Sequence, residues 1–322
     1  MTAAPATPRR AAPSGGPAVL LAVLAALCIG LSLGAEQFYS VENIIAILRQ
    51  CALVLIVACG MTMLLIAAEV DLSVGAALAF VGVVAMDVTN LTGSFALGLA
   101  AGVGFGGAVG LFNGLVVTLL RVNSLIATIA TLMILQGAVY LYSREAVQNA
   151  HRLQSFTDLS TGYVGPAPIP VLIALAVFAV AAVVLGRTVF GRQVYAVGAN
   201  PIAARLSGIR PARVKLILFV VTGLLTGLAG LILASLMNAG QPTAGRGFEL
   251  TVVAAVILGG TSLSGGRGTL VGTLLGVLIL KVIDNGIILL QMDQNLQMIV
   301  PGVVIILATW ADLIRSRGRA RR

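Results

Sequence analysis

Residues 198–215 read GANPIAARLSGIRPARVK and form a basic, polar passage inside a strongly apolar chain. Asn200 belongs to the residue types favoured at a helix N-cap, and Pro201 suits the first helical position. Gly208 suits a left-handed C-cap, and Pro211 prevents the helix from continuing. The stretch therefore predicts a helix of about two turns, closed at both ends. It also carries four positive charges within eleven residues: Arg205, Arg210, Arg213 and Lys215.

A helix this short is marginal by itself in water, so another surface is expected to hold it. Ile202 and Leu206 lie four residues apart and form a short apolar ridge. Ala203 and Ala204 give the helix a small face that a partner surface can approach closely. This design predicts a connector that docks into a groove of another protein.

The rest of the chain has the composition of a membrane protein. Hydrophobic residues make up 59% of it and charged residues only 10%, whereas soluble domains carry about 25% charged residues. Its mean hydropathy is +1.06. The net charge of +9 comes from basic residues at the ends of apolar segments, without the basic–aromatic interleaving of nucleic-acid-binding proteins. We therefore expect lipid as the solvent and no nucleic-acid partner.

Apolar runs predict an all-α polytopic membrane protein, because a bilayer leaves no backbone group unpaired. We expect about ten transmembrane helices, the third and eighth of them short for a crossing. Residues 17–311 are expected to be the transmembrane domain, with a disordered cytoplasmic tail at 1–16, a cytoplasmic loop at 187–215 and a basic cytoplasmic tail at 312–322. The predicted spans are 17–35, 51–68, 73–88, 95–120, 122–142, 169–186, 215–237, 250–263, 268–290 and 298–311.

The distribution of basic residues sets the expected orientation. With both termini in the cytoplasm, 15 of the 20 Lys and Arg residues lie on the inner side, including the tail and the 198–215 stretch. Cytoplasmic loops of membrane proteins carry such an excess. The opposite orientation would carry the basic residues of the 198–215 stretch across the membrane, so we reject it.

Two Gly/Ser-rich breaks interrupt the hydrophobic runs, DLSVG at 71–75 and SLSGG at 262–266. Their loose match, 191 residues apart, predicts two internally related halves. Broken helices suit either a solute pathway, where exposed backbone groups bind hydroxyls, or close helix packing through glycine. Both uses remain open. The candidate pathway residues are Asp71, Ser73, Asn113, Ser262, Ser264 and Asn285.

Charged side chains within the spans are expected to have a structural or functional role, because placing each one at the bilayer centre costs at least about 2.5 kcal/mol. Lys281 and Asp284 are three residues apart on one predicted helix, which favours a local structural pair. Asp71 suits a cap for the helix that begins near Ser73. Glu69 is a fourth charged residue near these spans, and the sequence assigns it no partner.

Four stretches together resemble permease subunits of ATP-binding-cassette importers of the ribose and simple-sugar class. They are DLSVG at 71–75, VNSLIATIATLMILQG at 122–137, GRQVYAVGANPIAARLSGIRPARVK at 191–215 and FELTVVAAVILGGTSLSGGRGT at 248–269. The resemblance covers roughly residues 40–310. It implies that the short helix sits in a cleft of a separate ATPase subunit. The implied coupling residues are Asn200, Pro201, Ala203, Ala204, Arg205, Leu206 and Gly208.

The chain departs from that pattern at three places. Ala68-Glu69 stands where Gly-Gly is usual, Thr251 where Asp is usual, and Gln136 where Arg is common. These changes leave the expected fold untouched and put the identity of the solute in doubt.

No G-x-x-x-x-G-K-[ST] loop occurs in the sequence, so ATP hydrolysis is assigned to another polypeptide. No nucleophile–base set, metal cluster or cofactor motif appears, and we expect neither an enzyme nor a cofactor. The expected function is import of a monosaccharide or similar small polar solute across a bacterial inner membrane. Expected partners are ATPase subunits, a second permease copy or paralogue, an extracytoplasmic solute-binding protein and membrane lipid. The alternatives are an importer of branched-chain amino acids or nucleosides and an ATP-independent transporter or channel.

Overall fold

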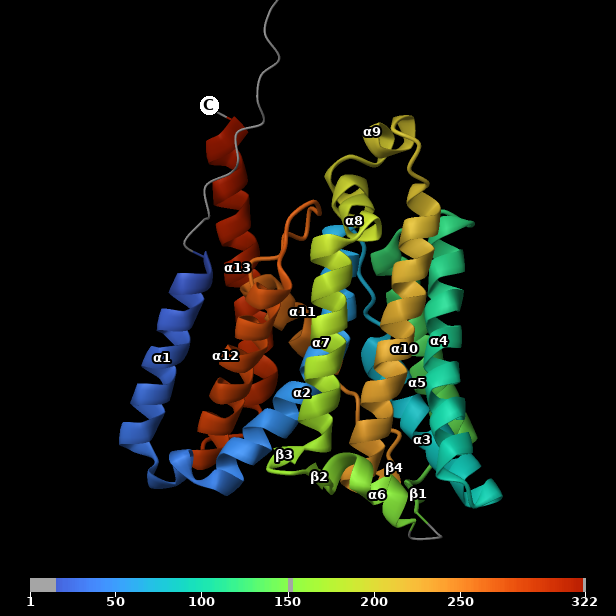
Figure 1. The fold of residues 1–322 in the computed structure, drawn as a ribbon, viewed down its shortest axis with the longest axis vertical. Coiled ribbons are helices and arrows are strands. Elements are labelled where there is room, and N and C mark those ends of the chain that lie inside the picture. The colour runs from blue at the N-terminus through green and yellow to red at the C-terminus, as the bar shows by residue number, and fades with distance from the viewer. Residues whose placement is uncertain (1–15, 150–152, 321–322) are drawn as a thin grey trace, which may run out of the picture.

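The computed structural model describes residues 16–149 and 153–320 and shows a bundle of long apolar helices (Figure 1). The predicted N-terminal tail lies outside the described residues except for Gly16. The helices are α1 (Gly16–Gly34), η1 (Glu36–Tyr39), α2 (Val41–Ile66), α3 (Val74–Thr92), α4 (Phe95–Thr118), α5 (Ser124–Tyr142), α6 (Gln154–Thr161), α7 (Ile169–Arg187), α8 (Val189–Ala199), α9 (Pro201–Leu206), α10 (Pro211–Met237), α11 (Phe248–Leu258), α12 (Leu270–Leu289) and α13 (Leu296–Ala320).

The described chain is an all-α polytopic membrane protein, as predicted. Eight of its helices are long and apolar enough to cross a bilayer. The eighth and tenth predicted spans correspond to shorter apolar helices, Phe248–Leu258 and Leu296–Leu307. At 1.5 Å per residue, α11 is about 16 Å long, roughly half of a hydrocarbon core. It is therefore a half-span, because Gly259 and Gly260 end it before it can cross.

Several predicted boundaries were wrong where a cap or a proline starts a helix earlier. The second span begins at Val41 because the Ser40 hydroxyl accepts the Asn43 N–H and caps α2. The seventh begins at Pro211 rather than at 215; the coupling loop 187–215 remains a prediction, and most of its residues are helical. The third span is longer than predicted and reaches Thr92. Helix α13 continues beyond 311 into the predicted basic tail.

Helix α2 forms the centre of the bundle. Its second half, residues 51–66, is buried throughout, and α7, α8, α10, α11 and α12 pack around it. Helix α1 lies at the periphery against α12. Exposed apolar side chains on the outer helices, such as Leu97 and Val180, form the surface expected to meet lipid.

Glycines bring α4 and α10 into backbone contact. A Cβ atom on Gly106 would lie 2.4 Å from the Gly223 carbonyl oxygen, and one on Gly110 would lie 2.3 Å from that of Phe219. Small residues allow this approach between membrane helices, where the hydrophobic effect supplies no attraction. Close packing is thus one use of the glycine-rich runs.

The two ends of the bundle differ. Helices α8 and α9 stand at one end, here termed the α9 end, and α13 also finishes there (Figure 1). The opposite end, termed the α6 end, carries α6 and two short antiparallel pairs. These pairs are β1 (Val147–Gln148) with β4 (Ala239–Gly240) and β2 (Tyr163–Val164) with β3 (Ala167–Pro168).

Candidate coupling helix and solute pathway

Helix α9 has the predicted caps at both ends. The Asn200 side-chain oxygen accepts the N–H groups of Ile202 and Ala203, each at 3.0 Å. At the other end Gly208 has φ +82°, and the N–H of Ile209 donates to the Ala204 carbonyl at 3.1 Å. These bonds satisfy the orphan groups that a six-residue helix would otherwise leave open, so α9 is a rigid unit.

The apolar ridge of α9 faces outward. Ile202 is 73% exposed and Leu206 is 85% exposed, so both large apolar side chains are open to a partner surface. Pro201, Ala203 and Arg205 are exposed beside them. The prediction that Ala204 offers a free surface was wrong. Its side chain is 4% exposed, because α9 packs this face against its own chain.

Helix α8 anchors α9 on the bundle through backbone contact. Gly198, at the end of α8, is so close to the end of α2 that an added Cβ would lie 1.7 Å from the Ile66 carbonyl oxygen. The Ile66 carbonyl in turn accepts the N–H of Gly266 at 2.8 Å. The Tyr195 hydroxyl donates to the Gly268 carbonyl at 2.8 Å. Helix α8 therefore contacts both the end of α2 and the loop that contains Gly266 and Gly268.

The two predicted breaks, 71–75 and 262–266, fall in two loops, except that Val74 and Gly75 already belong to α3. The first break, residues 67–73, joins α2 to α3, and the second break, residues 259–269, joins α11 to α12. They lie against each other at the α9 end of α2. Lys215 of α10 adds a further tie, since its ammonium group is ion-paired with the carboxylate of Glu69 in the first break.

Side chains from three elements close the first break. Asp71 Oδ1 accepts the backbone N–H of Ser73 at 2.9 Å and its hydroxyl at 2.6 Å. The Asn113 amide donates to both Asp71 oxygens and to the Ser73 hydroxyl, and Thr131 donates to Asn113 Oδ1. Each of these four side chains is at most 4% exposed. The prediction that Asp71 caps α3 was wrong: Ser73 is the N-cap residue, and Asp71 instead accepts the N–H and the hydroxyl of Ser73 within a buried cluster.

The remaining pathway candidates lie elsewhere. Ser262 and Ser264 belong to the second break, where Ser264 is exposed. Asn285 exchanges two amide hydrogen bonds with Asn43, at 3.1 and 2.6 Å, across α12 and α2. The six candidates therefore do not converge on one site. Lys281 and Asp284 form the predicted local pair at 2.7 Å.

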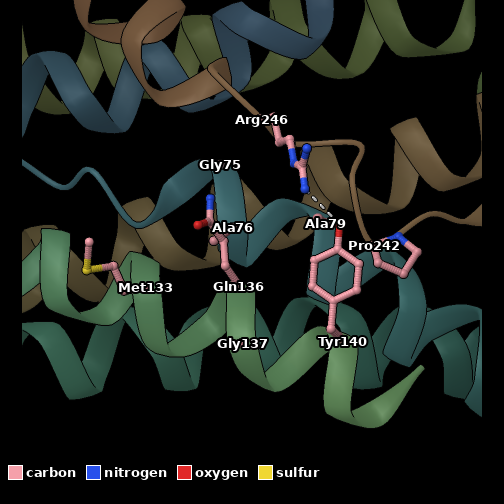
Figure 2. A pocket seen from close by; sticks show the side chains of 10 residues that line it. Gly75, Ala76, Ala79, Met133, Gln136, Gly137, Tyr140, Pro242 and Arg246 are labelled. Atoms are coloured by element: carbon pink, nitrogen blue, oxygen red, sulfur yellow. Dashed lines mark hydrogen bonds between the residues drawn. The ribbon is translucent and has the colours of Figure 1, made fainter. Parts of the chain in front are cut away.

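A cavity that the sequence did not indicate lies between α3, α5 and the segment 241–247. Its volume is about 310 Å³. The polar side chains that line it are Gln136, Tyr140 and Arg246, and a guanidinium nitrogen of Arg246 donates to the Tyr140 hydroxyl at 2.9 Å (Figure 2). Only Gln136 drew attention in the sequence, as a departure from the common Arg. Nothing in the linear pattern linked it to Arg246, 110 residues away.

Comparison with known proteins adds independent information. The ribose import permease protein RbsC of Escherichia coli (strain K12) is 39% identical over 91% of this chain and 92% of its own length. RbsC of Bacillus subtilis (strain 168) is 38% identical over 90% of both chains. The L-arabinose ABC transporter permease protein AraH of Azospirillum brasilense is 38% identical over 93% of this chain and 88% of its own. No solved structure gives a significant match.

A family model also matches residues 43–309, which include α3 to α12 completely and most of α2 and α13. Its description is branched-chain amino acid transport system, permease component. The match contains both breaks, α8, α9 and the cavity, so the whole arrangement described above lies within it. This chain therefore belongs to the family of branched-chain amino acid transport system permease components.

Proposed function

We propose that this chain is the membrane-spanning subunit of an ATP-driven importer that carries a monosaccharide, most closely a pentose, into a bacterial cell. The relatives that support this solute class are named as permeases for ribose and L-arabinose. The solute crosses the bilayer unchanged, and the chain performs no chemistry on it. A separate ATPase supplies the energy.

The exposed ridge of α9 is the observation that carries the coupling role. Burying a large aliphatic side chain contributes about 1.5–3 kcal/mol, so Ile202 and Leu206 give a partner two strong contacts on one small helix. The caps on both sides keep this helix from unravelling when force is applied. We assign the ATPase contact to Pro201, Ile202, Ala203, Arg205 and Leu206. Asn200, Ala204 and Gly208 hold the helix in shape.

Movement of α9 reaches the membrane helices through α8 and α10. Gly198 rests on the end of α2 and on the second break, while Lys215 is paired with Glu69 of the first break. When two ATPase subunits close, each α9 moves with its subunit, and the helices joined at these breaks change their packing. The pore then switches from one access state to the other.

The remaining partners follow from this role. A second permease copy or paralogue completes a two-fold pore, and an extracytoplasmic binding protein delivers solute to the α6 end. The α9 end and both termini face the cytoplasm of a multi-pass inner-membrane protein. This orientation agrees with the excess of basic residues at that end.

The variant Leu206→Asp tests the coupling role. It places a charge where the ATPase is proposed to bury an apolar side chain, and ATPase binding is expected to weaken at least ten-fold, about 1.4 kcal/mol. ATP-driven uptake of radiolabelled D-ribose or L-arabinose by the reconstituted transporter should fall with it. The measurements are co-purification of the ATPase with the permease and uptake by proteoliposomes.

Leu206→Met is the matched control, because it keeps an apolar side chain of similar size at the same position. It should bind the ATPase and transport sugar nearly as the unmodified chain does. Equal ATPase binding by the Asp and Met variants contradicts the coupling role. Uptake by the unmodified chain without any ATPase favours the ATP-independent alternative.

A further inference from the structure

The cavity between α3, α5 and the segment 241–247 has one wall of small residues and another that carries polar side chains. Glycines and small residues of α3 and of the 241–247 segment form one side, and α5 supplies two of the three polar side chains, Gln136 and Tyr140. Gln136 and Tyr140 are four residues apart, so they project from the same face of α5 (Figure 2). Arg246 reaches toward them from the 241–247 segment. Three hydrogen-bonding groups thus converge on one space.

We propose that this cavity holds the solute during its passage and that Gln136, Tyr140 and Arg246 select a neutral, hydroxyl-rich molecule. The proposal rests on the importer function above and names the site within it. A volume of about 310 Å³ lies at the small end of the range for small-molecule sites, roughly 300–1,000 Å³, which suits a monosaccharide.

The chemistry of the three side chains matches hydroxyl groups. The Gln136 amide both donates and accepts, the Tyr140 hydroxyl does the same, and Arg246 supplies several N–H donors. The Tyr140 ring and Pro242 add apolar surface for the C–H face of a sugar. The hydrogen bond from Arg246 to Tyr140 fixes both side chains before a solute arrives.

The charge of the cavity argues against an amino acid. A zwitterion needs a partner for its ammonium group as well as for its carboxylate, and no carboxylate lies among the residues lining the cavity. Glu249 packs its carboxylate near Gly75 without lining the space. Arg246 is exposed, so its charge remains solvated and a neutral solute does not have to neutralise it.

Gly137 offers a way to fill the cavity without disturbing the fold. It lines the space, and an added Cβ would meet no atom within 4 Å. Gly137→Leu is therefore expected to fold, to assemble with its partners and to reduce sugar uptake at least ten-fold. Gly104→Leu is the matched control: Gly104 is also exposed in a helix with open space at its Cβ, but it does not line the cavity.

The first experiment compares the two Leu variants in proteoliposomes that contain the complete transporter, ATPase subunits and binding protein included. Radiolabelled D-ribose and L-arabinose are the probes, and ATPase co-purification checks assembly. Loss of uptake in Gly137→Leu, with Gly104→Leu active and both assembled, supports the site. Equal uptake by both variants overturns it. If the unmodified chain takes up neither sugar, the proposed function fails, and the site assignment fails with it.

A second experiment tests selectivity with smaller changes. Tyr140→Phe and Arg246→Gln are expected to lower the maximal uptake rate about three- to ten-fold and to change the ratio of ribose to arabinose uptake. Tyr142→Phe removes a hydroxyl from the same helix outside the cavity and should leave that ratio unchanged. Stronger competition by L-leucine or by the sugar acid D-ribonate than by unlabelled ribose overturns selection of a neutral solute.

Discussion

The two breaks in the membrane helices resemble each other in sequence, yet they satisfy their backbone groups in different ways. The first break is held by side chains, with Asp71 as the common acceptor for Ser73 and Asn113. The second break is held by backbone bonds and glycines, among them the Gly266 N–H bond to Ile66. Side-chain clusters fail when an acceptor is removed, whereas glycine contacts fail when an atom is added. The comparison therefore predicts opposite sensitivities to substitution.

The largest effect is expected for Gly198→Ala, where α8 meets the second break. The new methyl group would lie 1.7 Å from the Ile66 carbonyl oxygen and 2.8 Å from the Gly266 nitrogen, so backbone has to move and their hydrogen bond is lost. Overpacking of this kind costs about 3 kcal/mol, at the upper end of its usual range. Unfolding in mixed detergent micelles, followed by circular dichroism, measures the loss.

Gly186→Ala is the control for that substitution. Gly186 is also a helical glycine near the α9 end, but a Cβ there meets nothing within 4 Å. It should unfold at the same detergent concentration as the unmodified chain or at a slightly higher one, since Ala favours helix over Gly. If Gly198→Ala is as stable as Gly186→Ala, the contact between Gly198 and the end of α2 can widen without a loss of stability.

The next effect is expected for Asp71→Ala in the first break. It leaves the N–H and the hydroxyl of Ser73 without their acceptor in a buried cluster, while the Asn113 amide keeps only the Ser73 oxygen, and the expected cost is about 2–3 kcal/mol. Asp71→Asn keeps one acceptor oxygen and should lose less. In the second break, Ser262→Ala removes the acceptor of one N–H group, that of Ser264, and should lose about 1 kcal/mol, less than Asp71→Ala, because the backbone bonds of this break remain. Equal losses for Asp71→Ala and Ser262→Ala would abolish the distinction between the breaks.

Local sequence signals predicted local structure well. The caps of α9 follow from Asn200 and Gly208 alone, and the Lys281–Asp284 pair follows from its spacing, because each depends on atoms within one helical turn or two. The class of fold follows from apolar runs of bilayer length. The half-span α11 differs from the prediction because Gly259 and Gly260 end the helix early, although the apolar sequence continues beyond them.

Contacts between distant segments could not be predicted in this way. The sequence does not indicate that Ala204 packs inward, that Glu69 meets Lys215, or that Gln136 and Arg246 share a cavity. These outcomes depend on how helices pack in three dimensions, where a rotation of a helix exchanges buried and exposed faces. An internal relation between the two halves remains a prediction.

The smallest effect is expected at Ala68 in the first break, and it has the opposite sign. Ala68 has φ +61°, in the left-handed region that costs an L-residue about 1–2 kcal/mol, at a position where the resembled permeases usually carry Gly. Ala68→Gly removes this strain. It also raises the conformational entropy of the unfolded chain, which lowers the free energy of unfolding by about 0.5–1 kcal/mol. The difference predicts a gain in stability of about 0 to 1.5 kcal/mol.

The neighbouring residue provides the control, because Ala67 has an ordinary φ of −80°. Ala67→Gly relieves no strain and should lose about 0.5–1 kcal/mol through the same entropy term. Opposite shifts of the unfolding midpoint in the two variants would locate the strain in one residue of the first break. If both variants lose stability equally, the left-handed backbone at Ala68 carries no strain. The left-handed turn would then not distinguish the first break from the second break, which is built from glycines.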